Sequence, residues 1–284
     1  LKTINIYLAY ALTGLVVGLL LYILLKIGLI WARAPKVPVL APNPSEDEYQ
    51  SYLSQTIEML KYNKNLSEID FDSNILTKEE LVTMAFDILD KKSLPLIKGN
   101  ANTIFISTAI SQNGSLDSIL VLTSMVKMIW QLASVYQTRP SLKSMGKLYL
   151  QVASVIFMAR SIEDADIIED QLEPLIAAIL GESIASAIPG MVPITNLVVS
   201  SIMEGSINAY LTLRVGIVTQ AYLGMEVPQT KSFIRKHASL QSLSYMGSII
   251  ADNSKLVIKS IATSVKKASS NTAKKWFGKK GTAK

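Results

Sequence analysis

The chain has 284 residues, of which 49% are hydrophobic and 7% aromatic, and its formal net charge is +6. It has no cysteine and one histidine, which excludes disulfides, thiolate metal sites, thiol nucleophiles and a multi-histidine metal site within one chain. Nine lysines and no acid lie between Lys255 and Lys284, and removing these nine charges leaves −3 for the rest. The basic balance therefore belongs to the C-terminal segment and does not indicate a nucleic-acid-binding core.

An uncharged run of twenty residues, from Ile6 to Leu25, dominates the N-terminal segment. An α-helix rises about 1.5 Å per residue, so such a run covers the roughly 30 Å core of a bilayer. It is too long for the apolar part of a signal peptide and no cleavage site follows, so we predict a retained transmembrane helix within an anchor over residues 1–33. Gly14 and Gly18 form a G-x-x-x-G pattern, which allows close helix–helix contact in lipid but also occurs often by chance in such segments.

Basic residues near the anchor predict its orientation. Lys26, Arg33 and Lys36 follow the run, and only Lys2 precedes it. The positive-inside rule therefore predicts that the chain after the anchor lies in the cytoplasm. Because the chain begins with Leu1 rather than Met, we expect further natural residues before it, where another transmembrane helix has room.

The rest of the chain is predicted to be helical. Residues 34–45 contain four prolines and predict an extended spacer. Capping boxes at Ser45 and Thr77 predict two helices in a connector over residues 46–95. Apolar periodicity between glycine and proline breakers continues from residue 96, and strand signals are weak. The predicted helices are 46–62, 77–90, 97–112, 116–137, 141–161, 163–187, 195–223 and 230–268. The predicted fold class is all-α, with the N-terminal transmembrane helix, a cytoplasmic helical bundle whose main domain covers residues 96–250, and a basic tail over 251–284.

An apolar hairpin is predicted between Leu175 and Met203, where Glu182 is the only charge and Pro189 lies near the turn. Each arm has room for about 13 helical residues, roughly 20 Å, which is too short to cross a bilayer. Two interpretations stay open. The hairpin is either buried in a soluble helical core or dips into lipid as a re-entrant element, and the second would favour a pore or transport component.

Small residues mark one face of the helix predicted over 195–223. Gly205 and Gly216 are eleven positions apart and share a face, which suggests the close approach of another backbone. Arg214 lies among apolar residues and is either a surface residue or one member of a buried ion pair with Asp117 or Glu204.

No catalytic motif is found. The sequence contains no P-loop, G-x-S-x-G, H-E-x-x-H or G-x-G-x-x-G pattern. Six acids crowd residues 163–173 at a predicted helix start, where surface acids favoured by the helix dipole are a better interpretation than a cation site. His237 follows Arg235 and Lys236 on a basic surface. We therefore expect no enzyme activity, no cofactor and no metal.

The basic tail is predicted to lie along the anionic inner leaflet, ordered only up to a helix that ends before Ser269. A solvated tail, and a basic arm that touches RNA or an acidic protein, are the alternatives. The membrane-surface residues are predicted to be Lys266, Lys267, Lys274, Lys275, Trp276 and Phe277.

Two groups of residues resemble a known pattern. The first is Ser107-Thr108-Ala109-Ile110-Ser111, Asp117, Leu132-Ala133, Tyr136 and Arg139-Pro140, and the second is Glu204-Gly205, Asn208-Ala209, Thr212 and Arg214-Val215-Gly216. Their order and spacing resemble the YcjF-like family of bacterial membrane proteins, a domain of unknown function, over roughly residues 100 to 225. The resemblance implies a helical inner-membrane protein with no established enzyme activity, sometimes fused to or encoded beside dynamin- or Era-like GTPase domains. The chain departs from the family pattern because it has no GTPase domain and one predicted transmembrane helix where such proteins often have two.

These observations predict a non-enzymatic scaffold or accessory subunit of a bacterial inner-membrane assembly, with most of the chain in the cytoplasm. The alternatives are a pore component that uses the 175–203 hairpin and a membrane effector of a separate GTPase. The expected partners are the bilayer, anionic lipid headgroups, other membrane subunits or a second copy of the chain, and a GTPase in trans, but not nucleic acid. The residues predicted to shape helix packing or interaction are Gly14, Gly18, Asp117, Gly205, Asn208, Arg214 and Gly216.

Overall fold

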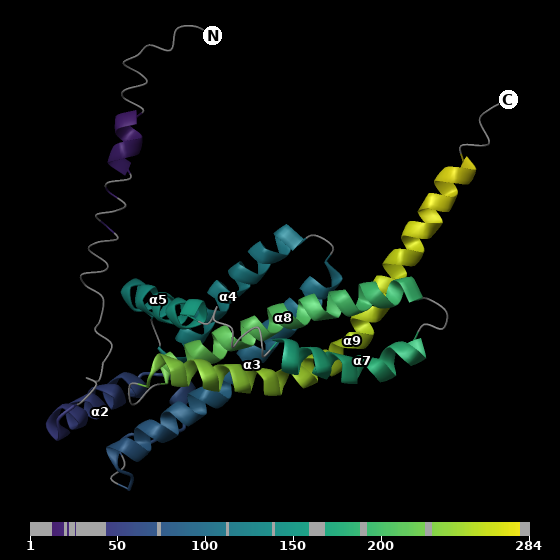
Figure 1. Cartoon of the computed structure of the whole chain (residues 1–284). Coiled ribbons are helices and arrows are strands. Elements are labelled where there is room, and N and C mark those ends of the chain that lie inside the picture. The colour runs from purple at the N-terminus through teal and green to yellow at the C-terminus, as the bar shows by residue number, and fades with distance from the viewer. Residues whose placement is uncertain are drawn as a thin grey trace.

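The computed structural model describes residues 13–19, 22, 26, 44–72, 75–111, 114–137, 140–158, 168–187, 192–224 and 229–278. Every regular element in these ranges is a helix (Figure 1), which confirms the all-α class. In chain order they are α2 (Glu46–Lys61), the 3-10 helix η1 (Lys64–Leu66), α3 (Lys78–Ile110), α4 (Gly114–Tyr136), α5 (Leu142–Met158), the π-helical turn η2 (Ile168–Leu172), α7 (Glu173–Ala187), α8 (Val192–Leu223) and α9 (Lys231–Gly278).

The predicted capping boxes begin α2 and α3. The Ser45 backbone N–H donates to the Glu48 carboxylate at 2.9 Å, and the Glu48 N–H donates back to the Ser45 hydroxyl at 3.3 Å. Thr77 and Glu80 repeat this exchange at 2.8 and 3.3 Å. Each box satisfies backbone donors that have no partner in a bare helix start, so the sequence determines where both helices begin.

The helix α3 is continuous where two helices were predicted. The expected end near Asp90 and new start at residue 97 are wrong, because α3 runs through Pro95 to Ile110. Proline removes one backbone hydrogen bond and usually kinks or ends a helix. Here Leu89 and Ile97, both 0% exposed, pack on either side of the proline and hold the helix together across it. The domain boundary expected between residues 95 and 96 therefore falls inside a helix.

The helix α9 also extends further than predicted. It was expected to end before Ser269 but continues to Gly278. Residues 269–277 contain no glycine or proline that would end the helix, and Ala273, Lys274 and Lys275 favour it. At about 1.5 Å per residue, its 48 residues give a helix roughly 70 Å long.

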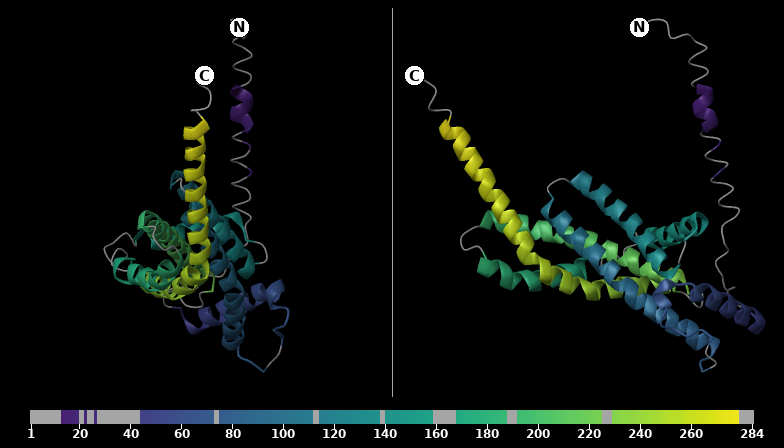
Figure 2. Two further views of the ribbon diagram at one scale, coloured as in Figure 1. Left: turned by 90° about the vertical axis from the view of Figure 1, so that its right-hand side faces the viewer. Right: turned by 180° about the vertical axis from the view of Figure 1, so that it is seen from behind.

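The centre of the bundle is the pair α3 and α8, which lie side by side in Figures 1 and 2. Helices α4 and α5 cover α8 on one side, and the first half of α9 packs on α3 and α8 on the other. Two polar contacts join α9 to α3. The Asn253 amide donates to the Asn102 side chain at 2.5 Å, and the Lys98 ammonium lies 3.8 Å from the centre of the Tyr245 ring.

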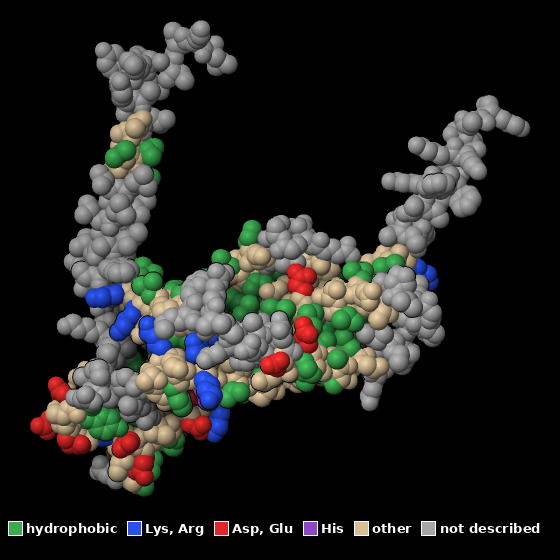
Figure 3. All heavy atoms as spheres, in the orientation of Figure 1, with side chains coloured by type: hydrophobic (Ala, Val, Ile, Leu, Met, Phe, Trp, Pro, Cys, Tyr) green, Lys and Arg blue, Asp and Glu red, His purple; other side chains and the backbone are tan. Residues whose placement is uncertain are grey.

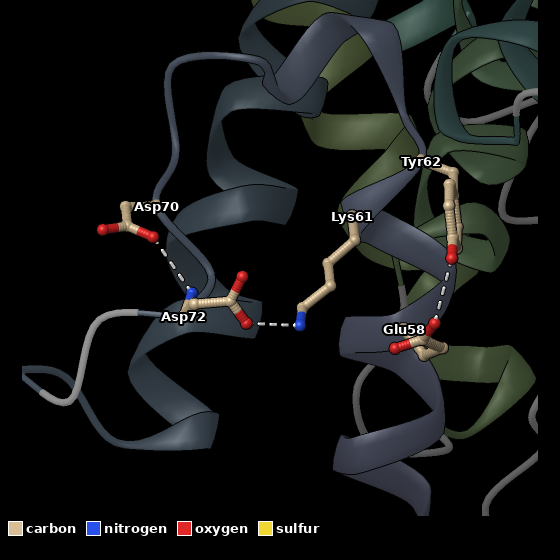
Figure 4. Close-up of polar contacts among 5 residues, drawn as sticks. All are labelled: Glu58, Lys61, Tyr62, Asp70 and Asp72. Carbon is tan, nitrogen blue, oxygen red and sulfur yellow. Dashed lines mark hydrogen bonds and ion pairs between the residues drawn. The ribbon is translucent and has the colours of Figure 1, made fainter.

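Buried apolar side chains form two clusters. The larger cluster joins residues of α3, α4, α5, α7, α8 and α9, whereas the smaller one joins α2, η1, the first half of α3 and Tyr136 at the end of α4. Surface contacts close the α2 end, where Lys61 pairs with Asp72 at 2.6 Å and the Tyr62 hydroxyl donates to Glu58 at 3.3 Å (Figure 4). Acidic side chains gather at this end of the surface (Figure 3).

Most of the predicted anchor and spacer lies outside the described residues. Residues 13–19 are helical and exposed, and no atom lies within 4 Å of a Cβ added to Gly14 or Gly18. The transmembrane helix over residues 6–25 therefore stays a prediction. Helix 13–19 and the C-terminal end of α9 project from the same side of the bundle in all three views (Figures 1 and 2).

We predict opposite effects of alanine at two helical glycines. A Cβ at Gly205 would lie 2.8 Å from the Phe105 carbonyl oxygen and 2.9 Å from the Ala109 Cβ, whereas a Cβ at Gly99 would meet nothing within 4 Å. Gly205→Ala should lower the free energy of unfolding by about 1–3 kcal/mol because α3 and α8 must separate. Gly99→Ala should raise it by up to about 1 kcal/mol through helix propensity alone. Denaturant unfolding measures both, and a stabilising Gly205→Ala would contradict the close approach.

Candidate functional site: a buried polar junction and an exposed apolar face

The structure brings several predicted residues to the contact between α3 and α8. A Cβ at Gly216 would lie 2.5 Å from the Ile97 side chain, and Gly205 lies against Phe105 and Ala109. Asn208, between the two glycines, is partly buried, and its carbonyl accepts a hydrogen bond from Thr212 at 2.8 Å. Ala109 of the first sequence group and Gly205 of the second, which both belong to the family resemblance, therefore meet at this contact.

Arg214 is fully buried, with 1% of its surface exposed, and is one of the largest buried side chains. The surface interpretation of this arginine is therefore wrong. Glu204, one partner considered for it, is exposed and lies about 15 Å away along the α8 axis. The side chain of Asp117, the other partner considered, lies outside the described part of the structure.

A polar junction connects the two apolar clusters, and it consists of Asp90 and Ser93 of α3, Tyr136 of α4 and Gln220 of α8. The Tyr136 hydroxyl donates a short hydrogen bond to the Asp90 carboxylate and lies 3.1 Å from the Ser93 hydroxyl. The Gln220 amide donates to the Asp90 backbone carbonyl at 3.1 Å and to the Ser93 hydroxyl at 3.0 Å. Three helices thus exchange hydrogen bonds in an otherwise apolar interior, where such bonds are strong and their loss is costly.

Burial sets the protonation preferences at the polar junction. It raises the pKa of Asp90 above its usual value, although the hydrogen bonds from Tyr136 and Gln220 oppose this shift. Burial, and then the neighbouring Asp90 carboxylate, raises the pKa of Tyr136, so its hydroxyl keeps its proton at neutral pH. A tyrosine donor facing a carboxylate acceptor is a stable structural pair.

Two asparagines hold the end of α4 at the same place. The Asn63 amide donates to the carbonyls of Val135 and Tyr136 at 2.9 and 3.1 Å, and the Asn65 amide donates to Val135 at 3.0 Å. The last carbonyls of a helix lack partners within the helix, so these side chains cap α4. The connector before α3 is thereby tied to the polar junction.

A small cavity of about 240 Å³ lies beside the polar junction, and Asp90, Gln220, His237 and Gln241 contribute to its lining. His237 is exposed, as predicted from its basic surroundings, and stacks on Phe233 with ring centres 6.2 Å apart. Asp90 reaches this cavity while its carboxylate accepts from Tyr136. The Asp90–Tyr136 hydrogen bond beside the cavity holds α3 and α4 together.

An exposed apolar stripe runs along α4. Its residues recur three or four positions apart and therefore share one side of the helix, which we call the α4 face. The α4 face consists of Ile119 (64% exposed), Leu122 (64%), Val126 (45%) and Trp130 (43%). Of the described helices, Ser118–Tyr136 within α4 alone is long and apolar enough to cross a membrane, and 28% of its most apolar stretch is buried.

The arms of the 175–203 hairpin contribute to the core. Ile176 and Leu180 of α7, and Val198 and Ile202 of α8, are buried in the larger cluster. A shallow cavity of about 520 Å³ lies between these arms. This packing favours the interpretation of a hairpin within the helical core, while residues 188–191 at its turn lie outside the described residues.

The acids of residues 163–173 and the lysines of the tail are exposed wherever the structure describes their side chains. Asp170 and Glu173 of the acidic cluster are exposed, and residues 159–167 lie outside the described residues. Lys266 and Lys267 are exposed near the end of α9. The side chains of Lys274, Lys275, Trp276 and Phe277 lie outside the described part, although their backbone is helical.

Comparison with known proteins assigns the chain to a family. A family model described as "Domain of unknown function (DUF697)" matches residues 76–239, more than half of the chain. The chain belongs to this family. A UPF0283 membrane protein of Rhizobium johnstonii is 29% identical over 129 residues, which are 45% of this chain and 31% of that protein. A UPF0283 membrane protein of Rhizobium leguminosarum bv. trifolii is 28% identical over 142 residues, which are 50% and 34% of the two chains.

These matches confirm the YcjF-like resemblance and support a membrane location. The chain spans about a third of the length of the relatives it matches. No solved structure is significantly similar to it. The matched region, 76–239, begins at the capping box of α3 and contains the polar junction, the contact between α3 and α8, and the α4 face.

Sequence reasoning did not find the polar junction or the α4 face. In the sequence, Tyr136 stands out only as part of the family pattern, and Asp90 only marks the predicted end of a helix. The spacing of Ile119, Leu122, Val126 and Trp130 was visible in the sequence, but it does not reveal which side of a helix is covered.

We predict that Asp90→Asn is tolerated and Asp90→Ala is not. The asparagine oxygen still accepts from Tyr136, whereas alanine leaves a buried hydroxyl without its acceptor, which costs about 1–3 kcal/mol. The folded state raises the pKa of Asp90, so the stability that its protonated form contributes is present below pH 3.8 and is lost as the pH rises through the folded value. Asp90→Asn should therefore equal or exceed the parent in stability at pH 7, and this advantage should shrink toward pH 4.

Thermal unfolding between pH 4 and pH 8 measures these differences. Asp87→Asn is the matched control, because Asp87 lies on the same helix, is 57% exposed and pairs at the surface with Lys91. Its charge is the smallest of the causes that raise the pKa of Asp90. That variant should show no comparable pH-dependent gain. An Asp90→Asn variant as unstable as Asp90→Ala would show that the negative charge itself is required.

Proposed function

We propose that the chain is a non-enzymatic, membrane-anchored scaffold or accessory subunit of a bacterial inner-membrane assembly, with its helical bundle in the cytoplasm. The observation that carries this proposal is the direction of its two ends. Helix 13–19 and the C-terminal end of α9 project from one side of the bundle (Figures 1 and 2). One end belongs to the predicted anchor and the other to the nine-lysine segment, so both ends reach toward the same membrane surface.

The packing of the bundle also supports a structural role. Asp90, Tyr136, Ser93 and Gln220 satisfy one another, and Arg214 is buried in the core. Buried polar groups of this kind specify how helices pack. A pore built from the 175–203 hairpin would require Ile176, Leu180 and Val198 to leave the larger apolar cluster. The scaffold therefore agrees better with the observed packing.

We predict that the tagged full chain, extracted from native membranes in mild detergent, carries defined partner subunits or further copies of itself. Replacing Gly14 and Gly18 by isoleucine should lower the recovery of any partner that contacts the anchor, while the chain stays in the membrane fraction. The matched control replaces Leu15 and Leu19 by isoleucine, which changes neighbouring exposed positions but keeps both glycines. Recovery of the chain alone, as a monomer, from gently solubilised membranes would contradict a scaffold.

We predict that the tail docks on anionic lipid. A chain that begins at residue 40 keeps both apolar clusters, because their first member is Leu53, and should fold without detergent. It should sediment with vesicles that contain phosphatidylglycerol but not with phosphatidylcholine vesicles, and added salt should release it by screening. Changing Lys266, Lys267, Lys274 and Lys275 to glutamine should strongly weaken this binding, because each lysine near an anionic surface contributes about 1 kcal/mol.

The control for this experiment changes Lys143 and Lys147 of α5, which are also exposed, to glutamine. If this pair lowers vesicle binding as much as the four tail substitutions, the attraction is general and not a property of the tail. Equal binding to neutral and anionic vesicles would contradict electrostatic docking.

A further inference from the structure

The helix α4 has a composition that its position in the bundle does not explain. Residues Ser118–Tyr136 are 19 residues long, about 28 Å, and as apolar as a membrane span. One side of the helix is buried at Met128, Ile129 and Leu132, which are at most 5% exposed. The opposite side is the α4 face, where four large apolar side chains are exposed to solvent in the isolated chain. Exposed apolar stripes of this size mark contact sites.

Several hydrogen bonds fix α4 lengthwise on the bundle. The Tyr149 hydroxyl of α5 donates to the Val126 carbonyl at 3.0 Å, near the middle of the apolar segment. At its end, Tyr136 bonds to Asp90, and Asn63 caps the last carbonyls. A helix that crossed the membrane would lose these bonds and expose the buried positions Met128 and Leu132. The packed state of α4 is therefore compatible with contact along the membrane surface and not with a span.

The position of α4 in the bundle also agrees with contact at the membrane. The N-terminal end of α4 rises on the side from which helix 13–19 and the end of α9 project, while the first half of α9 lies on the far side of the bundle (Figures 1 and 2). Lys127 is exposed beside Trp130, and this combination of a basic and an aromatic residue suits the headgroup region. The nine lysines of the tail attract the same anionic surface.

We propose that the α4 face inserts into the interface of the lipid bilayer, with α4 at the membrane surface and its other side still packed on α3 and α8. Amphipathic helices bound in this way bury their apolar side about 5–10 Å into the boundary between headgroups and acyl chains. This inference rests on the membrane anchoring in the proposed function, and it identifies the bilayer itself as the partner of the α4 face.

The chain contains no cysteine, which allows a direct test with single labels. Leu122→Cys and Val126→Cys carry an environment-sensitive fluorophore on the α4 face. Leu240→Cys is the matched control, since Leu240 is 54% exposed on the first half of α9, against 64% for Leu122. The full chain is reconstituted into vesicles of phosphatidylethanolamine and phosphatidylglycerol that contain lipids with a quenching nitroxide at a shallow or a deep acyl position. Flotation verifies that each labelled protein is in the vesicles.

We expect the nitroxide lipids to quench the fluorescence of labels at residues 122 and 126 strongly. The fluorescence of the label at residue 240 should be the same in vesicles with and without nitroxide lipid. The shallow nitroxide should quench both α4 labels more than the deep one, because the helix lies at the interface. Stronger quenching of residue 126 by the deep nitroxide would indicate a spanning helix and overturn the proposal. Quenching at residue 240 equal to that at 122, or no quenching at 122 and 126, would overturn it as well.

These outcomes are separate from the test of the scaffold. Loss of quenching at the α4 face with flotation intact contradicts only the interfacial docking of α4. Failure of the chain to float contradicts the membrane anchoring on which both proposals depend. Absence of co-purifying partners contradicts the scaffold and leaves the quenching result unaffected, because the vesicles contain only lipid and this chain.

Discussion

The close approach of α3 and α8 is the contact on which the rest of the bundle depends. Gly205 and Gly216 lie about 16 Å apart along α8, which is three turns of helix. Atoms of α3 lie so close to each glycine that a side chain there would push α3 away. Glycine inside a helix costs roughly 1 kcal/mol relative to alanine, so two of them weaken α8 considered alone. Close packing of two helices of 33 and 32 residues offsets this cost through many small dispersion contacts. The other helices then pack on a pair whose spacing is already determined.

The polar junction solves a second problem, which is how the smaller apolar cluster attaches to the larger one. Apolar contact between the clusters would not by itself fix the rotation of α4 relative to α3. The bonds from Tyr136 to Asp90 and from Gln220 to Ser93 are directional, so they select one arrangement of three helices. Partial burial disfavours the charged form of Asp90, and the hydrogen bonds that Tyr136 and Gln220 donate offset part of this cost.

The sequence predicts the helices better than it predicts their environment. Capping boxes at Ser45 and Thr77 are local, so the starts of α2 and α3 follow from a few residues each. The continuity of α3 through Pro95 is not local, because it depends on Leu89 and Ile97 packing against other helices. The same limit applies to Arg214, whose burial is a property of the whole core. The spacing of apolar residues shows which side of a helix is apolar. It does not show whether another helix covers that side, and this is the only difference between the exposed α4 face and a buried apolar side.

The arrangement of membrane contacts has a mechanical consequence for the proposed scaffold. An anchor alone would leave the bundle free to rotate and tilt at the end of a spacer. Tail docking as proposed would add a second attachment. Because α9 is one continuous helix of 48 residues that packs on α3 and α8, the direction of its end is coupled to the core. With the α4 face as a third contact, the bundle would have a fixed orientation on the bilayer. A partner subunit would then meet the same surface of the bundle in every copy, and presenting a surface in this reproducible way is what an assembly requires of a scaffold.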